Sequence, residues 1–183
     1  GSDETVKGAS FDAKTGSVTV PARTVAVFTQ AAGERIDPTV TPDPAAAQWV
    51  AAGDGRWWLR YPDGSYPANE RVVRDGVTYS FDANGWMKTG WQDEDGVWRY
   101  YGPSGAMATG WAAVGGTWYY LDPDTGAMAT GWVQDGDTWY YLRANGSMAS
   151  GWVNLSGAWF YLNGNGSMAT GWAKLGGTWY YLT

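Results

Sequence analysis

The chain has 183 residues, a formal net charge of −6, and neither cysteine nor histidine. The absence of cysteine excludes a disulfide framework and thiolate chemistry, and the absence of histidine removes the commonest general base and metal ligand. The acidic balance argues against nucleic acid as a partner, because no basic stripe is present to neutralise phosphates. No apolar run approaches the ~20 residues of a membrane-spanning helix, so no membrane span is expected.

Aromatic residues with a polar edge dominate the apolar content. The chain has 14 Trp and 12 Tyr against 4 Phe, together with 27 Gly. Trp and Tyr suit a surface that is apolar but in contact with water, and glycine suits a series of tight turns. The composition therefore indicates a protein that uses ring faces, in a fold rich in turns.

Residues 1–30 predict a short β segment. Residues 18–28 are rich in β-branched side chains and alternate at Val25 and Val27, and a turn signal at 12–16 allows Ser10 and Phe11 to pair across it. This segment is too short to bury a core of its own. Residues 31–47 contain three prolines and predict a linker, with a helical turn expected at 45–50.

Repeats begin near Trp49, and residues 48–90 hold degenerate copies. The second of these copies has Arg71 and Thr78 where tryptophans stand in later copies, followed by Tyr79 and Ser80. The N-terminal copies are therefore expected to lack a good aromatic site.

Residues 91–183 repeat one pattern: Gly-Trp, a turn, Trp-Tyr-Tyr-Leu, a second turn, then Gly-x-Met-Ala-Thr-Gly. The glycines that open the copies lie 20, 21, 20 and 20 residues apart, at Gly90, Gly110, Gly131, Gly151 and Gly171. A short fixed period indicates a stack of small units instead of one globular core. We predict an all-β solenoid of stacked β-hairpins with a superhelical path.

The turn at Gly115 and Gly116 fixes the register of one hairpin. Two-residue loops of this kind tolerate positive φ, so Ala113 pairs with Trp118, and Trp111 pairs with Tyr120. Opposite residues project to one face and alternate residues share it. The same counting in every regular copy collects two indoles and one phenol on one face, and it assigns the opposite face, Tyr119 and Leu121, to packing.

The Trp/Trp/Tyr face predicts ligand binding, because a purely structural face would usually contain Leu, Ile and Val. Three rings around a gap form a cage that attracts quaternary ammonium groups. A flat aromatic platform would instead stack against a sugar ring, and a structural spacer or dimerisation arm would bury every ring. Residue types leave these three interpretations open.

The run from Gly110 to Trp132 closely resembles the choline-binding repeat of bacterial cell-wall-binding proteins. The resemblance covers about residues 70–183. It implies choline sites between successive hairpins, each made by two Trp of one hairpin and a Tyr of the next, often with a Met. Carried over, the sites would be Trp91, Trp98 and Tyr120 with Met128; Trp111, Trp118 and Tyr141 with Met148; Trp132, Trp139 and Tyr161 with Met168; and Trp152, Trp159 and Tyr181. Trp172 and Trp179 would form half a site or a dimer contact.

Two further resemblances frame the alternatives. The related glucan-binding repeats of glucansucrases usually lack the second Trp that this chain keeps, which favours choline over an α-glucan such as starch. Residues 17–28 resemble the closing strands of the C-terminal β-sandwich in pullulanase-type glycoside hydrolases. This resemblance implies that residues 1–30 are the incomplete end of a preceding β-sandwich and that the chain is the tail of a secreted enzyme.

No catalytic arrangement is expected within the chain. The aspartates cluster in hairpin turns, where they have an ordinary structural role, and neither a metal-ligand spacing nor a phosphate loop appears. We therefore expect a non-catalytic module without cofactor. It would hold a secreted enzyme on the bacterial cell surface by binding choline of teichoic-acid-type polymers, with a homodimer as a further option.

Overall fold

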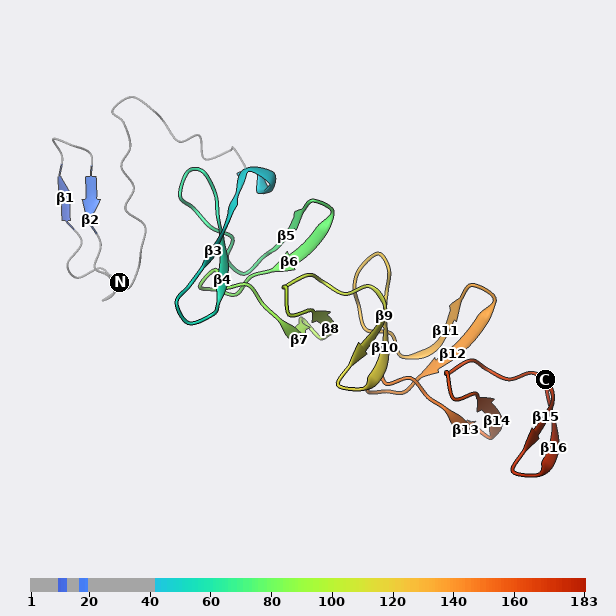
Figure 1. The fold of residues 1–183 in the computed structure, drawn as a ribbon. Coiled ribbons are helices and arrows are strands. Elements are labelled where there is room, and N and C mark those ends of the chain that lie inside the picture. Colours follow the sequence, from blue (N-terminus) through green and yellow to red (C-terminus); the bar gives the residue numbers. More distant parts are fainter. Residues whose placement is uncertain (1–9, 13–16, 20–41) are drawn as a thin grey trace. The chain divides into compact units, whose positions relative to one another are not determined.

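The computed structural model describes residues 10–12, 17–19 and 42–183 and divides the chain into two compact units, Gly1–Lys88 and Thr89–Thr183 (Figure 1). In the first unit β1 (Ser10–Asp12) pairs antiparallel with β2 (Ser17–Thr19), with Ser10 opposite Thr19 and Phe11 opposite Val18. The pairing expected across the 12–16 turn is therefore confirmed. The remainder of the strand expected at 18–28, and most of the linker, lie outside the described residues.

A single 3₁₀ turn, Pro44–Ala46, leads into the repeats of the first unit, where the Asp43 carboxylate accepts a hydrogen bond from Ala45 N at 2.9 Å. Strand β3 (Gln48–Ala51) then pairs with β4 (Trp57–Arg60), and Val50 lies opposite Trp58. The expected helical turn over 45–50 is therefore wrong beyond residue 46, because Ala47 already has an extended backbone. Proline fits a first helical turn, but the β-branched and aromatic residues that follow form a cross-strand ladder instead.

The first unit has its own small hydrophobic core. Strands β5 (Arg71–Arg74) and β6 (Val77–Ser80) form its second hairpin of repeat type. The buried cluster contains Ala47, Leu59, Tyr61, Val72 and Phe81, and Trp49, Tyr79 and Met87 pack against it. The degenerate copies therefore keep the hairpin architecture while replacing its usual aromatic residues.

Five consecutive hairpins form the second unit. Their strands are β7 (Gly90–Glu94), β8 (Val97–Tyr101), β9 (Gly110–Val114), β10 (Thr117–Leu121), β11 (Gly131–Asp135), β12 (Thr138–Leu142), β13 (Gly151–Leu155), β14 (Ala158–Leu162), β15 (Gly171–Leu175) and β16 (Thr178–Leu182). Each sheet of this unit contains two antiparallel strands, and Figure 1 shows each as a separate hairpin. The predicted fold of stacked hairpins is confirmed.

The predicted register is also confirmed. Ala113 lies opposite Trp118, and Trp111 lies opposite Tyr120. The two-residue loop between them has positive φ at both positions, 58° at Gly115 and 79° at Gly116. Such turns match the twist of the flanking strands, so this loop fixes which side chains share a face.

The segment between hairpins connects each hairpin to the one before it. Met128 N donates to Trp98 O, and Ala129 N donates to Tyr120 O, both at 2.8 Å. The same Met-to-Trp bond recurs at Met148–Trp118, Met168–Trp139 and, in the first unit, Met87–Trp57. The leucines that end the second strands are fully buried, namely Leu121, Leu142 and Leu162. Backbone bonds and a buried leucine in each of the three middle copies therefore hold the stack together.

Methionine and glycine of successive segments fit each other. A Cβ placed on Gly146 would overlap Met128 Sδ, and Gly146 also has a φ of 78°. The same relation holds between Met107 and Gly126 and between Met148 and Gly166. Glycine is required here both by the left-handed backbone and by the close approach of the neighbouring thioether.

Candidate aromatic binding sites between hairpins

Two indoles form a corner on the exposed face of three consecutive hairpins, β9–β10, β11–β12 and β13–β14. The ring centroids of Trp111 and Trp118 are 6.5 Å apart with an interplanar angle of 80°. The next two hairpins repeat this arrangement, at 6.3 Å and 87° for Trp132–Trp139 and at 6.3 Å and 84° for Trp152–Trp159. A perpendicular pair presents two ring faces to one volume and can serve as two walls of a cage.

An aromatic ring of the following hairpin meets the first indole of each corner. The ring centroids of Trp111 and Tyr140 are 4.6 Å apart. The equivalent contacts are Trp91–Tyr119, Trp132–Phe160 and Trp152–Tyr180. These rings occupy the first position after the second Trp of each copy, which the sequence predicts to serve packing alone. The half-buried Tyr119 does pack, but it packs against the preceding Trp face, because consecutive hairpins turn opposite faces toward each other.

The second Tyr of each copy was predicted to belong to the site of the preceding hairpin. In the structure its ring lies close to the first Trp of its own hairpin. Tyr120 is 5.1 Å from Trp111 between ring centroids, and Tyr100, Tyr141, Tyr161 and Tyr181 have the same relation to their own first Trp. No ring contact joins Tyr120 to Trp91 among the contacts described. The second Tyr nevertheless reaches the preceding hairpin's corner in the last copy, where a pocket forms.

That pocket has a volume of about 590 Å³ and is lined by Trp152, Trp159, Tyr180, Tyr181 and Leu182. It brings together the three residues predicted for the fourth site and adds Tyr180 and Leu182. An open apolar hollow with a few polar edges is the usual form of a small-ligand site. The same positions of the earlier copies are the other predicted site residues.

The methionines of the predicted sites lie beside the expected tryptophans along the backbone. Met128 N bonds to Trp98 O, Met148 N to Trp118 O and Met168 N to Trp139 O. The side chains of Met128 and Met148 point toward Gly146 and Gly166, so their thioethers pack against the next segment. The packing of Met128 and Met148 against these glycines therefore contributes to the spacing of the hairpins.

Solvent reaches the second indole of every regular hairpin. The exposed fractions are 45% for Trp98, 47% for Trp118, 40% for Trp139 and 62% for Trp159. Such large exposed indoles on one face mark an interaction surface. The interpretation as a spacer with every ring buried does not fit these exposures.

The first unit uses its aromatic residues differently. Trp49 meets Tyr79 at 4.9 Å, as a regular first indole would, but Phe81 also stacks on it at 6.1 Å and 27°. Ser80 stands where later copies have the second Tyr and is 2% exposed. The Arg56 guanidinium lies 3.9 Å from the ring centroid of Trp86 and forms an ion pair with Asp54 at 2.7 Å. In the first unit, packing therefore covers Trp49 and an internal cation covers one face of Trp86.

Two carboxylates, Asp122 and Asp135, lie near Tyr120 in the hairpin that carries Trp111 and Trp118. Burial raises the pKa of Tyr120, and the nearby Asp135 and Asp122 carboxylates raise it further, so this phenol is neutral at neutral pH. Hydrogen bonds from Thr125 lower the pKa of Asp122, which keeps that carboxylate ionised. Asp135 and Asp122 therefore place negative charge near the ring of Tyr120.

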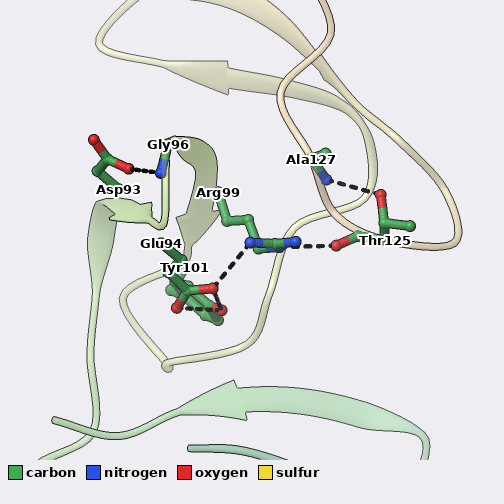
Figure 2. Close-up of polar contacts among 7 residues, drawn as sticks. All are labelled: Asp93, Glu94, Gly96, Arg99, Tyr101, Thr125 and Ala127. Atoms are coloured by element: carbon green, nitrogen blue, oxygen red, sulfur yellow. Dashed lines mark hydrogen bonds and ion pairs between the residues drawn. The ribbon is translucent and has the colours of Figure 1, made fainter. Parts of the chain in front are cut away.

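The first hairpin of the second unit replaces its buried apolar residues with a polar cluster (Figure 2). Arg99 Nη1 donates to Glu94 Oε2 at 3.2 Å, and Arg99 Nε donates to the Thr125 carbonyl at 3.0 Å. Tyr101 donates its phenolic hydrogen to Glu94, at 3.1 Å from Oε1. Arg99 stands at the position of Tyr119, so this hairpin presents no ring there.

Other functional sites are not formed by the described part of the chain. No group of three or more His, Cys, Asp or Glu side chains in it comes together in a way that could hold a metal ion. Nor does any helix among the described residues have the length and apolarity needed to cross a membrane.

Two family models match the second unit and the end of the first. The model described as a choline-binding repeat matches residues 88–131 and 149–183, and the model described as a putative cell wall binding repeat matches residues 130–148. No curated protein matches the chain in sequence.

Solved structures with similar folds include choline-binding proteins. Choline binding protein F from Streptococcus pneumoniae, crystallised with a peptidoglycan analogue, is 43% identical over 73% of this chain and 48% of its own, with a TM-score of 0.67. CbpJ from the same species is 43% identical over 73% of this chain and 49% of its own, with a TM-score of 0.68. The endolysin from phage Cp-1, complexed with choline, is 38% identical over 74% of this chain and 40% of its own, with a TM-score of 0.51. The chain thus spans about half the length of the first two proteins and 40% of the endolysin.

Proposed function

Residues 88–183 place the chain in the choline-binding repeat family, and on this premise we propose that it is a cell-surface binding module for choline. It takes the quaternary ammonium groups of cell-wall polymers into aromatic corners between consecutive hairpins. The phage endolysin with similar repeats was solved with choline, and choline binding protein F with a peptidoglycan analogue. Both ligands support a cell-wall polymer as the partner.

The open pocket between the last two hairpins is the observation that carries the proposal. Trp152, Trp159 and Tyr180 offer ring faces to one hollow of about 590 Å³, and no cationic side chain lines it. A trimethylammonium group needs apolar surface for its methyls and ring faces for its charge. Each cation–π contact contributes about 0.5–2 kcal/mol, so three rings give a site with a Kd of roughly millimolar order.

Four sites follow from the repetition of this geometry. Each contains two Trp of one hairpin and the aromatic pair of the next strand. We propose Trp91 and Trp98 with Tyr119, Tyr120 and Met128; Trp111 and Trp118 with Tyr140, Tyr141 and Met148; Trp132 and Trp139 with Phe160, Tyr161 and Met168; and Trp152 and Trp159 with Tyr180 and Tyr181. Weak sites on one module add through multivalency on a polymer.

The wider setting of the module is also a proposal. The resemblance of residues 17–28 to the end of a pullulanase-type β-sandwich supports attachment of a secreted glycoside hydrolase. Trp172 and Trp179 are 70% and 60% exposed, and large exposed rings support a contact between two copies of the last hairpin. Analytical ultracentrifugation across a range of protein concentrations tests that homodimer.

Isothermal titration with choline and with maltoheptaose tests the function. We expect saturable heat from choline with a Kd near millimolar and no saturable heat from maltoheptaose. Saturation by maltoheptaose without a choline response would identify an α-glucan-binding module instead. The absence of saturable heat with both ligands would contradict any binding role for these corners.

The titration requires an ionic-strength control, because the acidic chain attracts any cation. Sodium chloride and tetramethylammonium chloride at matched concentrations separate the two effects. Tetramethylammonium is expected to compete with choline, whereas sodium is expected to leave the choline isotherm saturable.

A further inference from the structure

In one of the four proposed sites, an indole N–H donates a hydrogen bond to a carboxylate. Trp111 Nε1, in β9, donates a hydrogen bond to Asp135 Oδ2, in β11, at 3.0 Å. Asp135 is exposed and ends the first strand of the next hairpin. The bond therefore crosses from one hairpin to the next at the rim of the Trp111 and Trp118 corner.

The other sites have an apolar residue at this position. The register places Asp135 opposite Thr138, at the end of its strand. The same strand-end position is Val114 beside the first site, Leu155 beside the third and Leu175 beside the fourth. The four sites have aromatic rings at the same positions, and only the second has a charged residue at this strand end.

We propose that Asp135 makes the Trp111 and Trp118 corner the tightest of the four sites for a quaternary ammonium ligand. This inference rests on the proposed function and concerns the ranking of its sites. The Asp135 carboxylate is held at the edge of the Trp111 ring, and the face of that ring contacts the guest. The negative charge therefore lies close to the bound cation without direct contact.

Coulomb attraction across roughly 6 Å at high dielectric strengthens cation binding about two- to fivefold at low salt. The advantage falls toward unity when salt screens exposed charges. Asp135 also contributes, after burial, to the raised pKa of Tyr120, whose ring centroid lies 5.1 Å from that of Trp111. A neutral guest of the same shape gains nothing from this field.

Site-resolved titration of the indole N–H signals of Trp98, Trp118, Trp139 and Trp159 in the full chain measures the ranking of the four sites. In 20 mM salt, we expect choline to saturate the Trp118 signal first. The variant Asp135→Asn keeps an acceptor for Trp111 Nε1 and removes the charge. It is expected to weaken choline binding at Trp118 about two- to fivefold and to leave the Trp159 response unchanged.

Two matched controls separate charge from shape. The neutral isostere 3,3-dimethyl-1-butanol is expected to bind the Trp118 corner equally in the unchanged protein and in Asp135→Asn. The converse variant Leu175→Asp is expected to strengthen choline binding at Trp159 by a similar factor.

The outcomes distinguish this inference from the function on which it rests. Equal choline affinity at all signals with no effect of Asp135→Asn overturns the ranking and leaves choline binding intact. An equal loss for the neutral isostere assigns Asp135 a purely structural role and also overturns the ranking. Absence of any saturable choline response in the unchanged protein overturns the proposed function itself.

Discussion

At the scale of single residues, the choice of Trp and Tyr over Leu and Ile decides what each hairpin can do. Trp118 is 47% exposed, so half of its surface adds little to folding and is available to a guest. Its partner Trp111 is more enclosed, between Tyr120 and Tyr140 at 5.1 Å and 4.6 Å. One indole of each corner is therefore positioned by packing, while the other is open to solvent.

Replacement of Trp118 by Ala is expected to remove one site and reduce the choline stoichiometry from four to three. The loss of stability is expected to stay near 1–2 kcal/mol, since the ring is only half-buried. Isothermal titration and urea unfolding measure the two effects.

Trp57→Ala is the matched control for Trp118→Ala, because Trp57 is 44% exposed in a hairpin of the first unit without a proposed site. We expect it to leave the stoichiometry unchanged. Loss of all choline binding in Trp118→Ala would show that the sites are not independent.

A second residue-scale prediction concerns the spacing of the hairpins. Gly146→Ala places a Cβ against Met128 Sδ at a φ of 78°. Gly131→Ala meets the same backbone strain at a φ of 80°, but with nothing within 4 Å of the new Cβ. Positive φ alone costs about 1–2 kcal/mol. Urea unfolding is expected to show a larger loss for Gly146→Ala, and equal losses would contradict the role of the thioether contact.

The residue pattern was sufficient to predict the pairing within a hairpin but not the contacts between hairpins. Alternation and the Gly115–Gly116 turn determine that Trp111 and Tyr120 share a face, and the structure has this register. Tyr119 was expected only to pack, because its face is opposite to Trp111 in its own hairpin. Its contact with Trp91 depends on the rotation from one hairpin to the next, which no local rule encodes.

At the scale of the element, the hairpin β7–β8 contains a buried ion pair that the next hairpin lacks. Its Arg99 and Glu94 side chains are 11% and 15% exposed and form an ion pair at 3.2 Å. Equivalent positions in the next hairpin are Tyr119 and Val114. Removing one partner of a buried pair leaves the other charge without compensation, while replacing the whole pair by packed residues is often neutral.

Arg99→Ala is therefore expected to destabilise the second unit by about 3 kcal/mol. A triple replacement, Glu94→Val with Arg99→Tyr and Tyr101→Leu, installs the residues of the next hairpin and is expected to recover most of this loss. Chemical denaturation of both variants measures the difference. A triple variant as unstable as Arg99→Ala would contradict the view that the cluster substitutes for ordinary packing.

At the scale of the whole molecule, the two units share hairpins but differ in their aromatic surfaces. The first unit has a closed core around Leu59 and Phe81, and Arg56 covers one face of its Trp86. The second unit repeats an open corner. The 20-residue period was sufficient to predict this solenoid organisation, whereas the filling of ring faces in the first unit depends on Phe81 and Arg56, whose contacts do not follow from the repeat.

Choline is accordingly expected to stabilise the second unit alone. A ligand at ten times its Kd adds about 1.4 kcal/mol for each occupied site. Hydrogen exchange is expected to slow across β7–β16 in saturating choline and to remain unchanged across β3–β6. Equal protection of both units would place additional choline sites in the first.

A crystal structure of the chain grown with choline would show directly whether the aromatic corners bind this ligand. We expect a trimethylammonium group against Trp152, Trp159 and Tyr180, with equivalent density in the other corners. Fully formed but empty corners in crystals saturated with choline, with the ligand bound elsewhere, would contradict it.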